Sequence, residues 1–157
     1  MKPLFISSLY HPNQVGGAEK VVRIIAESML VHGHTPVVVT THDGRADHVA
    51  DVNGVKVHYL ALKNIYWPYA PTQRRAVSKA IWHGIESYNL PMARAVARVL
   101  DGEKPDVVNT HNLTGLSCAA WGAVKSRGLP LIHTLHDYSL MCPKTSMYNH
   151  RLKSRGQ

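Results

Sequence analysis

The sequence predicts an α/β fold in which an open, mainly parallel sheet is flanked by helices. Short apolar runs alternate with amphipathic segments along most of the 157 residues, a pattern typical of βαβ units. The runs at residues 4–6 and 37–40 are almost continuously apolar, as in parallel strands that are buried on both faces. Polar side chains gather directly after the later runs. The length favours one domain with a sizeable core.

The elements of the first half follow in order. The run at residues 4–6 predicts a strand, and Gly16-Gly17 follows it as a turn. Helical spacing begins at Ala18 and Gly33 ends it. Residues 37–40 predict the second strand. The polar residues 41–53 predict a loop, and the alternating residues 55–60 predict a third strand nearer the edge of the sheet.

The second half begins with residues 63–73, whose prolines exclude a regular helix or a central strand. We expect a loop with aromatic side chains there. Helices are predicted at 77–88 and 92–100, a strand at 107–111, a helix at 114–127 and a strand at 131–136. Residues 1–143 form the predicted domain, and the polar residues 144–157 predict the start of a truncated segment.

The chain is strongly basic, with 18 Lys and Arg against 10 Asp and Glu and a formal net charge of +8. This balance suits a phosphate-bearing partner, and it equally suits a solvated basic surface. Cys118 and Cys142 show no metal-site spacing and favour a cytoplasmic setting. We find no signal segment, no membrane span and no nucleic-acid-binding motif.

Three predicted strand ends converge on one crevice. They carry Gly16-Gly17, His111-Asn112 and His136-Asp137. Ligands of open α/β sheets bind outside the carboxyl ends of the strands, where the strand order reverses. Adjacent glycines before a helix start allow close approach of an anionic group, typically a phosphate. Each feature alone is also compatible with a plain turn or a structural histidine, so the prediction depends on their convergence.

Several familiar sites do not fit. The turn matches neither G-x-G-x-x-G nor G-x-x-x-x-G-K-[ST], which disfavours a nicotinamide cofactor and a P-loop. A nucleophile elbow G-x-S-x-G is absent from the sequence, which disfavours a Ser-His-Asp hydrolase. His133 and His136 differ by an odd number of residues and point to opposite faces of a continuous strand, which disfavours a metal site. We expect no metal and no cofactor.

Five motifs in matching order carry a resemblance to a known family. They are Gly16-Gly17-Ala18-Glu19 with Gly33-His34, Tyr88-Asn89, Pro105-Asp106-Val107-Val108, His111-Asn112 with Gly115-Leu116-Ser117, and Leu135-His136-Asp137-Tyr138 with Cys142-Pro143. In these residues the chain resembles the amino-terminal domain of family 4 glycosyltransferases of the GT-B fold. The resemblance implies a Rossmann-like half of a GT-B enzyme and a second, donor-binding domain that this chain lacks. We therefore expect the isolated domain to be inactive.

The resemblance also implies roles for individual residues. Gly16 and Gly17 correspond to the turn that closes over the diphosphate of a nucleotide-sugar donor. His136 corresponds to the catalytic strand-end histidine beside the transferred sugar. His111, Asn112, Asp137 and Tyr138 would line the acceptor side. The implied reaction is a metal-free transfer with retention of configuration, to a glycan or lipid-linked acceptor in polysaccharide or glycolipid biosynthesis.

Two further interpretations stay open. Trp67, Tyr69, Arg74, Arg75, Lys79 and Trp82 combine aromatic rings with cations. Such residues are typical of peripheral contact with an anionic membrane, here its cytoplasmic face, and equally of helix packing with solvated charges. The alternative function is a non-catalytic α/β binding module that holds a phosphorylated ligand in its basic crevice.

Overall fold

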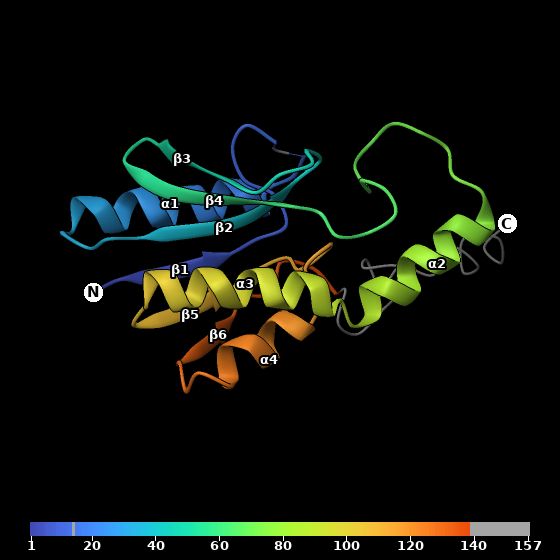
Figure 1. Cartoon of the computed structure of the whole chain (residues 1–157). Coiled ribbons are helices and arrows are strands. Elements are labelled where there is room, and N and C mark those ends of the chain that lie inside the picture. Colours follow the sequence, from blue (N-terminus) through green and yellow to red (C-terminus); the bar gives the residue numbers. More distant parts are fainter. Residues whose placement is uncertain (14, 139–157) are drawn as a thin grey trace, which may run out of the picture.

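The computed structural model describes residues 1–13 and 15–138. Over these residues the strands are β1 Pro3–Ile6, β2 Val37–His42, β3 His48–Val52, β4 Val55–Ala61, β5 Val107–Thr110 and β6 Leu131–His133. They form one mostly parallel sheet in the order β3-β4-β2-β1-β5-β6, flanked by helices (Figure 1). This confirms the predicted fold class. The expected domain end at 143, Cys142-Pro143 and the segment 144–157 lie outside the described residues.

The strand order reverses at β1. This strand pairs in parallel with β2 on one side and with β5 on the other. A reversal of this kind leaves a crevice outside the carboxyl ends of the two central strands. The crevice therefore lies at the ends of β1 and β5, as expected from the first turn of the chain.

Each central strand sends alternate side chains into two cores, one on each face of the sheet. Leu4 and Ile6 lie in the core shared with α3 (Leu90–Glu103) and α4 (Ala119–Lys125). Phe5 lies in the core shared with α1 (Ala18–Val31). Burial on both faces is the physical reason why the strand runs are continuously apolar.

The polar stretch at 41–53 is not a loop throughout, which corrects one prediction. Its second half is β3, which pairs antiparallel with β4 at the edge of the sheet. Asn53 and Gly54 join the two strands with φ angles of 54° and 83°, the left-handed geometry of a two-residue hairpin. Because β3 is largely solvent-facing, its polar composition resembles that of a loop.

Two predicted helix ends are confirmed. Gly33 (φ 76°) ends α1, and its N–H donates to the carbonyl of Leu30 at 2.9 Å. Asn89 separates α3 from the preceding helix, and its side-chain oxygen accepts the backbone N–H of Met92 at 3.1 Å. Both contacts satisfy backbone groups that a helix end leaves without intrahelical partners.

Two elements are shorter than predicted. Helix α4 begins at Ala119 because Gly115 and Ser117 have φ angles of 88° and 62°, which interrupt a helix. Strand β6 ends at His133, so His136 lies in the following loop. The argument against a metal site from the spacing of His133 and His136 assumed a continuous strand. It therefore does not apply.

Helix α2 (Ala76–Ser87) projects beyond the end of the sheet at which the parallel strands finish (Figure 1). Trp82 is its buried residue, and its indole N–H donates to the carbonyl of Tyr66 at 3.0 Å. The tryptophan thus holds the aromatic loop, residues 63–73, against the helix. Among the described residues, no helix has the length and apolar character needed to cross a membrane.

Candidate functional site

Ser8 and Asn112 join the two strand ends that form the floor of the crevice. The N–H and the hydroxyl of Ser8 both donate to the Asn112 carbonyl at 2.8 Å. The carbonyl of Ser8 accepts the Thr41 hydroxyl at 2.6 Å. The side-chain oxygen of Asn112 accepts the N–H and hydroxyl of Thr114 at 3.1 and 2.9 Å. The amide oxygen of Asn112 therefore shapes the floor, whereas its amide nitrogen has no hydrogen-bond partner among the described residues.

His111 and His136 meet at the end of β5. Nδ1 of His111 lies 2.8 Å from Nε2 of His136, and the rings stack with centroids 5.1 Å apart. His111 is 1% exposed, whereas His136 is exposed at the surface. Burial, together with the nearby His136 and His133, lowers the pKa of His111 to about 4. At neutral pH the buried imidazole of His111 is therefore uncharged, and it contacts the exposed imidazole of His136.

A second chain of contacts anchors the loop that carries His136. The indole N–H of Trp121 donates to the Thr110 hydroxyl at 3.0 Å, and that hydroxyl lies 2.9 Å from Nδ1 of His133. The hydroxyl of Thr134 donates to the Asn109 side chain at 3.1 Å. These bonds fix the end of β6 against β5. Within the described part of the chain, no three His, Cys, Asp or Glu side chains are arranged to hold a metal ion.

Gly16 and Gly17 lie at the amino end of α1. Gly17 is the N-cap residue, and the N–H of Gly16 donates to the carboxylate of Glu19 at 3.0 Å. A Cβ added to Gly17 would meet nothing within 4 Å among the described residues, whereas one added to Gly16 would lie 3.5 Å from that carboxylate. The fold itself therefore does not require glycine at Gly17, and the space in front of it is open.

Tyr69 and Glu86 enter the same region although the sequence did not single them out as site residues. The hydroxyl of Tyr69 interacts with the side chains of Ser8 and Thr114, and burial raises the pKa of this phenol. Glu86 accepts the N–H of Gly115 at 2.7 Å. The second carboxyl oxygen of Glu86 is buried and has no hydrogen-bond partner among the described residues. Both residues come from segments remote in sequence, so no local pattern marks them.

The sequence matches the family described as "Glycosyl transferase 4-like domain" over residues 16–155. The chain belongs to this family. It is 40% identical over 148 residues to a Klebsiella pneumoniae protein described as an uncharacterized 42.6 kDa protein in the cps region. The match covers 94% of this chain and 40% of that relative. The glycosyltransferase-like domain described here thus spans about two fifths of the length of its relative.

Two solved structures share the fold of this glycosyltransferase-like domain. The catalytic domain of starch synthase IV from Arabidopsis thaliana, bound to ADP and acarbose, is 19% identical, with a TM-score of 0.51 over 87% of this chain and 34% of that chain. Sucrose-phosphate synthase from Thermosynechococcus elongatus is 16% identical, with a TM-score of 0.56 over 98% of this chain and 39% of that chain. They confirm the expected GT-B-type Rossmann-like architecture.

The domain brings together some of the residues predicted for the site. His111 and His136 are in contact, and Asn112 lies beside Ser8 and Thr114. Asp137 and Tyr138 are exposed in the loop that follows His136. The roles assigned to these residues, and to Gly16 and Gly17, stay predictions. His111 was predicted to line the acceptor side, but its side chain is buried. The crevice residue that it contacts is His136.

Replacing Glu86 with glutamine should stabilise the domain at alkaline pH. Burial raises the pKa of Glu86 to about 7, against a hydrogen bond from Gly115 that lowers it. The folded-state pKa lies above the unfolded value of about 4.5. The wild type therefore loses stability as the pH rises from about 4.5 to about 7, and above pH 7 the loss stays constant. Urea unfolding should show the variant about 1–2 kcal/mol more stable at pH 8 and equal at pH 4. A pH-independent difference would contradict the assignment.

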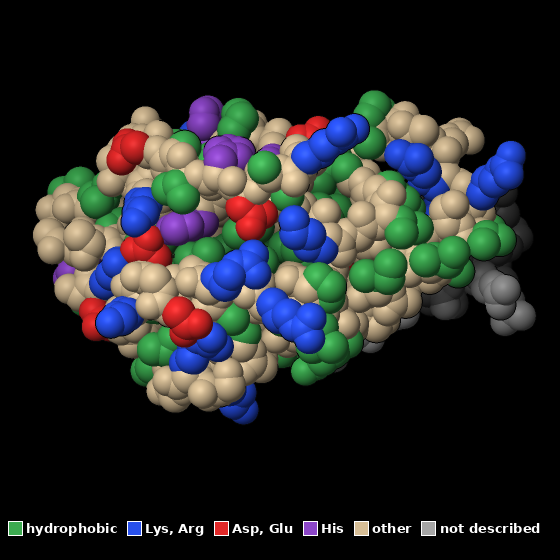
Figure 2. Space-filling model, viewed as in Figure 1, with side chains coloured by type: hydrophobic (Ala, Val, Ile, Leu, Met, Phe, Trp, Pro, Cys, Tyr) green, Lys and Arg blue, Asp and Glu red, His purple; other side chains and the backbone are tan. Residues whose placement is uncertain are grey.

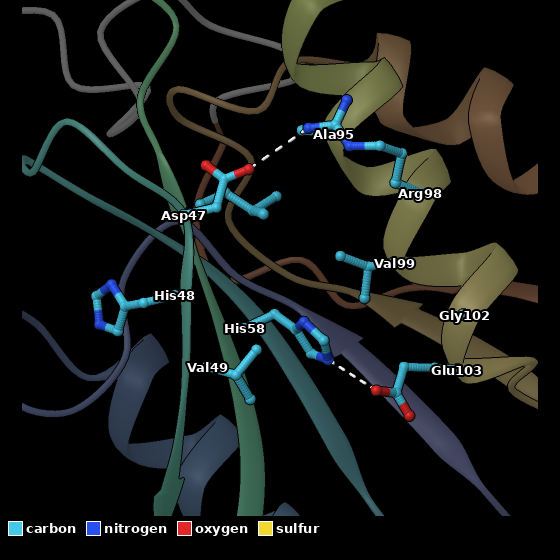
Figure 3. Close-up of a pocket in the computed structure, with 10 residues that line it drawn as sticks. Asp47, His48, Val49, His58, Ala95, Arg98, Val99, Gly102 and Glu103 are labelled. Carbon is cyan, nitrogen blue, oxygen red and sulfur yellow. Dashed lines mark hydrogen bonds and ion pairs between the residues drawn. The ribbon is translucent and has the colours of Figure 1, made fainter.

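A cavity of about 250 Å³ lies away from the crevice, between α3 and the strands β3 and β4 (Figure 3). Asp47 and Arg98 form an ion pair at 3.4 Å at one end of it. His58 and Glu103 are 2.8 Å apart at the other end. Among the described residues, Asp47, Arg98, His58 and Glu103 are therefore all paired within the protein, and the ring of His48 stacks on Tyr59.

Proposed function

We propose that this chain is the acceptor-side domain of a retaining glycosyltransferase. The enzyme transfers a sugar from a nucleotide-diphosphate sugar to a glycan or lipid-linked acceptor in polysaccharide or glycolipid biosynthesis. The observation that carries the proposal is the exposed His136 held by the buried His111 at the crevice of a glycosyltransferase-family domain. The relative in the cps region supports the biosynthetic setting.

In this reaction the bond between the anomeric carbon and the diphosphate oxygen breaks, and a bond to the acceptor oxygen forms. The nucleoside diphosphate leaves with the bonding electrons, and its departing oxygen takes the proton that the acceptor hydroxyl loses. His136 donates a hydrogen bond to the transferred sugar and stabilises the transition state through its fixed dipole. The start of α1 at Gly17 offers N–H groups and a positive dipole end to the diphosphate.

The carboxylate of Glu19 limits where a diphosphate can bind at the start of α1. It already accepts the N–H of Gly16, and its charge opposes a phosphate placed directly on that bond. The diphosphate therefore approaches on the Gly17 side, where a Cβ would meet no atom of the described residues within 4 Å. A second domain supplies the remaining donor contacts, and this chain alone turns over no donor.

The proposal is tested with the chain completed by the remaining residues of its 42.6 kDa relative, hereafter the completed enzyme. Incubation with a panel of nucleotide sugars and a lipid or glycan acceptor fraction should release nucleoside diphosphate and yield a glycosylated product without added metal. The 157-residue chain should release none. Tight nucleotide-sugar binding by the completed enzyme, without turnover of any donor, would favour the binding module instead.

We also propose that the aromatic loop and α2 contact an anionic membrane. Residues 64–85 contain three Lys and Arg and no Asp or Glu. Val77 and Ile81 are 71% and 50% exposed on α2, and Figure 2 shows cations beside hydrophobic side chains at this end of the molecule. Tyr69 is turned into the crevice instead, so the contact depends on α2. Cations beside apolar side chains favour an interface with anionic lipids.

Co-sedimentation with liposomes tests this contact. The chain should bind vesicles that contain anionic lipid at low salt, and high salt should release it because the charges are then screened. Arg75→Gln with Lys79→Gln should weaken binding about thirtyfold, since each cation near the surface contributes about 1 kcal/mol. Lys104→Gln with Lys125→Gln removes the same charge elsewhere and should have little effect. Equal losses in both double variants would overturn the assigned surface.

A further inference from the structure

We propose that His111 is a positioning residue that holds His136 in the tautomer with its proton on Nδ1. His111 donates its Nδ1–H to Nε2 of His136, 2.8 Å away. His136 then presents Nδ1–H as its free donor at the exposed side of the pair. The catalytic use of this donor rests on the proposed function, whereas the tautomer itself does not.

The surroundings of His111 place its proton. Its Nε2 is buried and has no hydrogen-bond partner among the described residues. If His136 were the donor, the neutral His111 ring would carry its proton on this Nε2, as an N–H group without an acceptor. Buried orphan N–H groups are rare because they forfeit the whole hydration of a strong donor. With its proton on Nδ1 instead, His111 leaves only an unpaired lone pair on the buried Nε2. We therefore place the proton of His111 on Nδ1.

The backbone and the ring neighbours hold His111 in this orientation. Its N–H donates to the carbonyl of Ile6 at 2.8 Å, which extends the pairing of β1 and β5 beyond Thr110. The ring of Phe5 lies 6.1 Å away on one side. The histidine is therefore fixed at the junction of the two central strands. This rigid support is what a group that orients another side chain requires.

The charge state of the pair points the same way. Burial and the neighbouring His136 and His133 lower the pKa of His111, so it stays neutral at physiological pH. A protonated His136 would have to donate from Nε2 and would force the proton of His111 onto the buried Nε2. With the single proton of the neutral His111 on Nδ1, Nε2 of His136 accepts it, and His136 acts as a hydrogen-bond donor through Nδ1.

Nitrogen NMR of the 157-residue chain tests the tautomer directly. Long-range ¹H–¹⁵N correlation at about pH 8, above the ordinary histidine pKa, distinguishes protonated from unprotonated ring nitrogens. We expect His136 with Nδ1 protonated and Nε2 unprotonated, and His111 with Nδ1 protonated. His136 protonated on Nε2 in the folded wild-type chain would overturn the inference, whatever the activity of the completed enzyme.

Two variants separate positioning from packing. His111→Asn keeps an N–H donor near the position of Nδ1, and His111→Leu removes the donor but fills the site. In the asparagine variant His136 should keep the Nδ1–H tautomer, and in the leucine variant it should lose it. In the completed enzyme His111→Leu should lower kcat by one to two orders of magnitude, roughly, with KM changed less, and His111→Asn should restore most of the loss. Equal kcat in the two variants would contradict the positioning role.

The outcomes for the two proposals are distinct. If His136 carries the Nδ1–H tautomer but His136→Ala leaves turnover intact, the proposed function of His136 fails and the inference about His111 stands. If turnover depends on His136 while its proton lies on Nε2, the inference fails and the proposed function stands.

Discussion

Replacing His136 with alanine should lower kcat of the completed enzyme by about 10²- to 10³-fold, the loss expected when one preorganised transition-state donor is removed. The side chain is exposed, and His111 is its hydrogen-bond partner. Its removal therefore leaves the cores intact. Thermal unfolding should change little, and steady-state kinetics with the preferred nucleotide sugar measures the effect.

His34 supplies a matched control for this experiment. It is a histidine beyond the end of α1, on a segment that takes no part in the crevice. His34→Ala should leave kcat and KM unchanged. A His136→Ala enzyme that keeps near-normal kcat would exclude His136 from the reaction.

Replacing Glu103 with alanine should destabilise the fold by about 2–3 kcal/mol, since the fold loses a nearly buried carboxylate together with its charge-assisted hydrogen bonds to three side chains. The carboxylate of Glu103 is 7% exposed and lies 2.5 Å from the amines of Lys2 and Lys56 and 2.8 Å from His58. These partners come from β4 and the amino terminus, so the carboxylate ties the end of α3 to the sheet. Urea unfolding at neutral pH measures the loss.

The same network predicts how the loss depends on pH. Burial raises the pKa of Glu103, but hydrogen bonds from Lys2, Lys56 and His58 outweigh it and lower the pKa to about 2. A lowered folded-state pKa gives stability that is present above the unfolded value of about 4.5 and is lost as pH falls toward 2. The difference between wild type and Glu103→Ala should therefore shrink below pH 4.5.

Asp101 is the control for Glu103. It forms an ion pair with Arg127 at 2.6 Å, but its side chain is 61% exposed. Exposed pairs add little to stability because water screens them. Asp101→Asn should therefore leave the unfolding midpoint almost unchanged. A loss as large as that of Glu103→Ala would show that burial does not distinguish the two pairs.

Much of the fold could be predicted from the sequence because its signals are local. The continuous apolar run of β2 reports burial on both faces, and Gly33 and Asn89 mark helix ends by their own backbone chemistry. The same logic failed where local composition was ambiguous. The polar residues of β3 resembled a loop, although Asn53-Gly54 carried the signal of a hairpin turn.

The candidate site was predictable only in outline. Polar residues after strand ends indicated a crevice, because parallel strands end at one edge of the sheet. The sequence did not assign His111 to His136, which follows it by 25 residues, or place Tyr69 beside Ser8 and Thr114. Glu86 occupies an ordinary polar helix position and gave no signal at all.

By itself the sequence determined an α/β domain with a glycine turn before α1 and polar strand ends, because periodicity and turn chemistry act over a few neighbouring residues. Only the tertiary structure decided which histidine is buried and which is exposed, and that Lys2, Lys56 and His58 share one carboxylate. Those contacts join residues up to 101 positions apart. They arise when the sheet and helices pack together, and no local pattern in the chain encodes them.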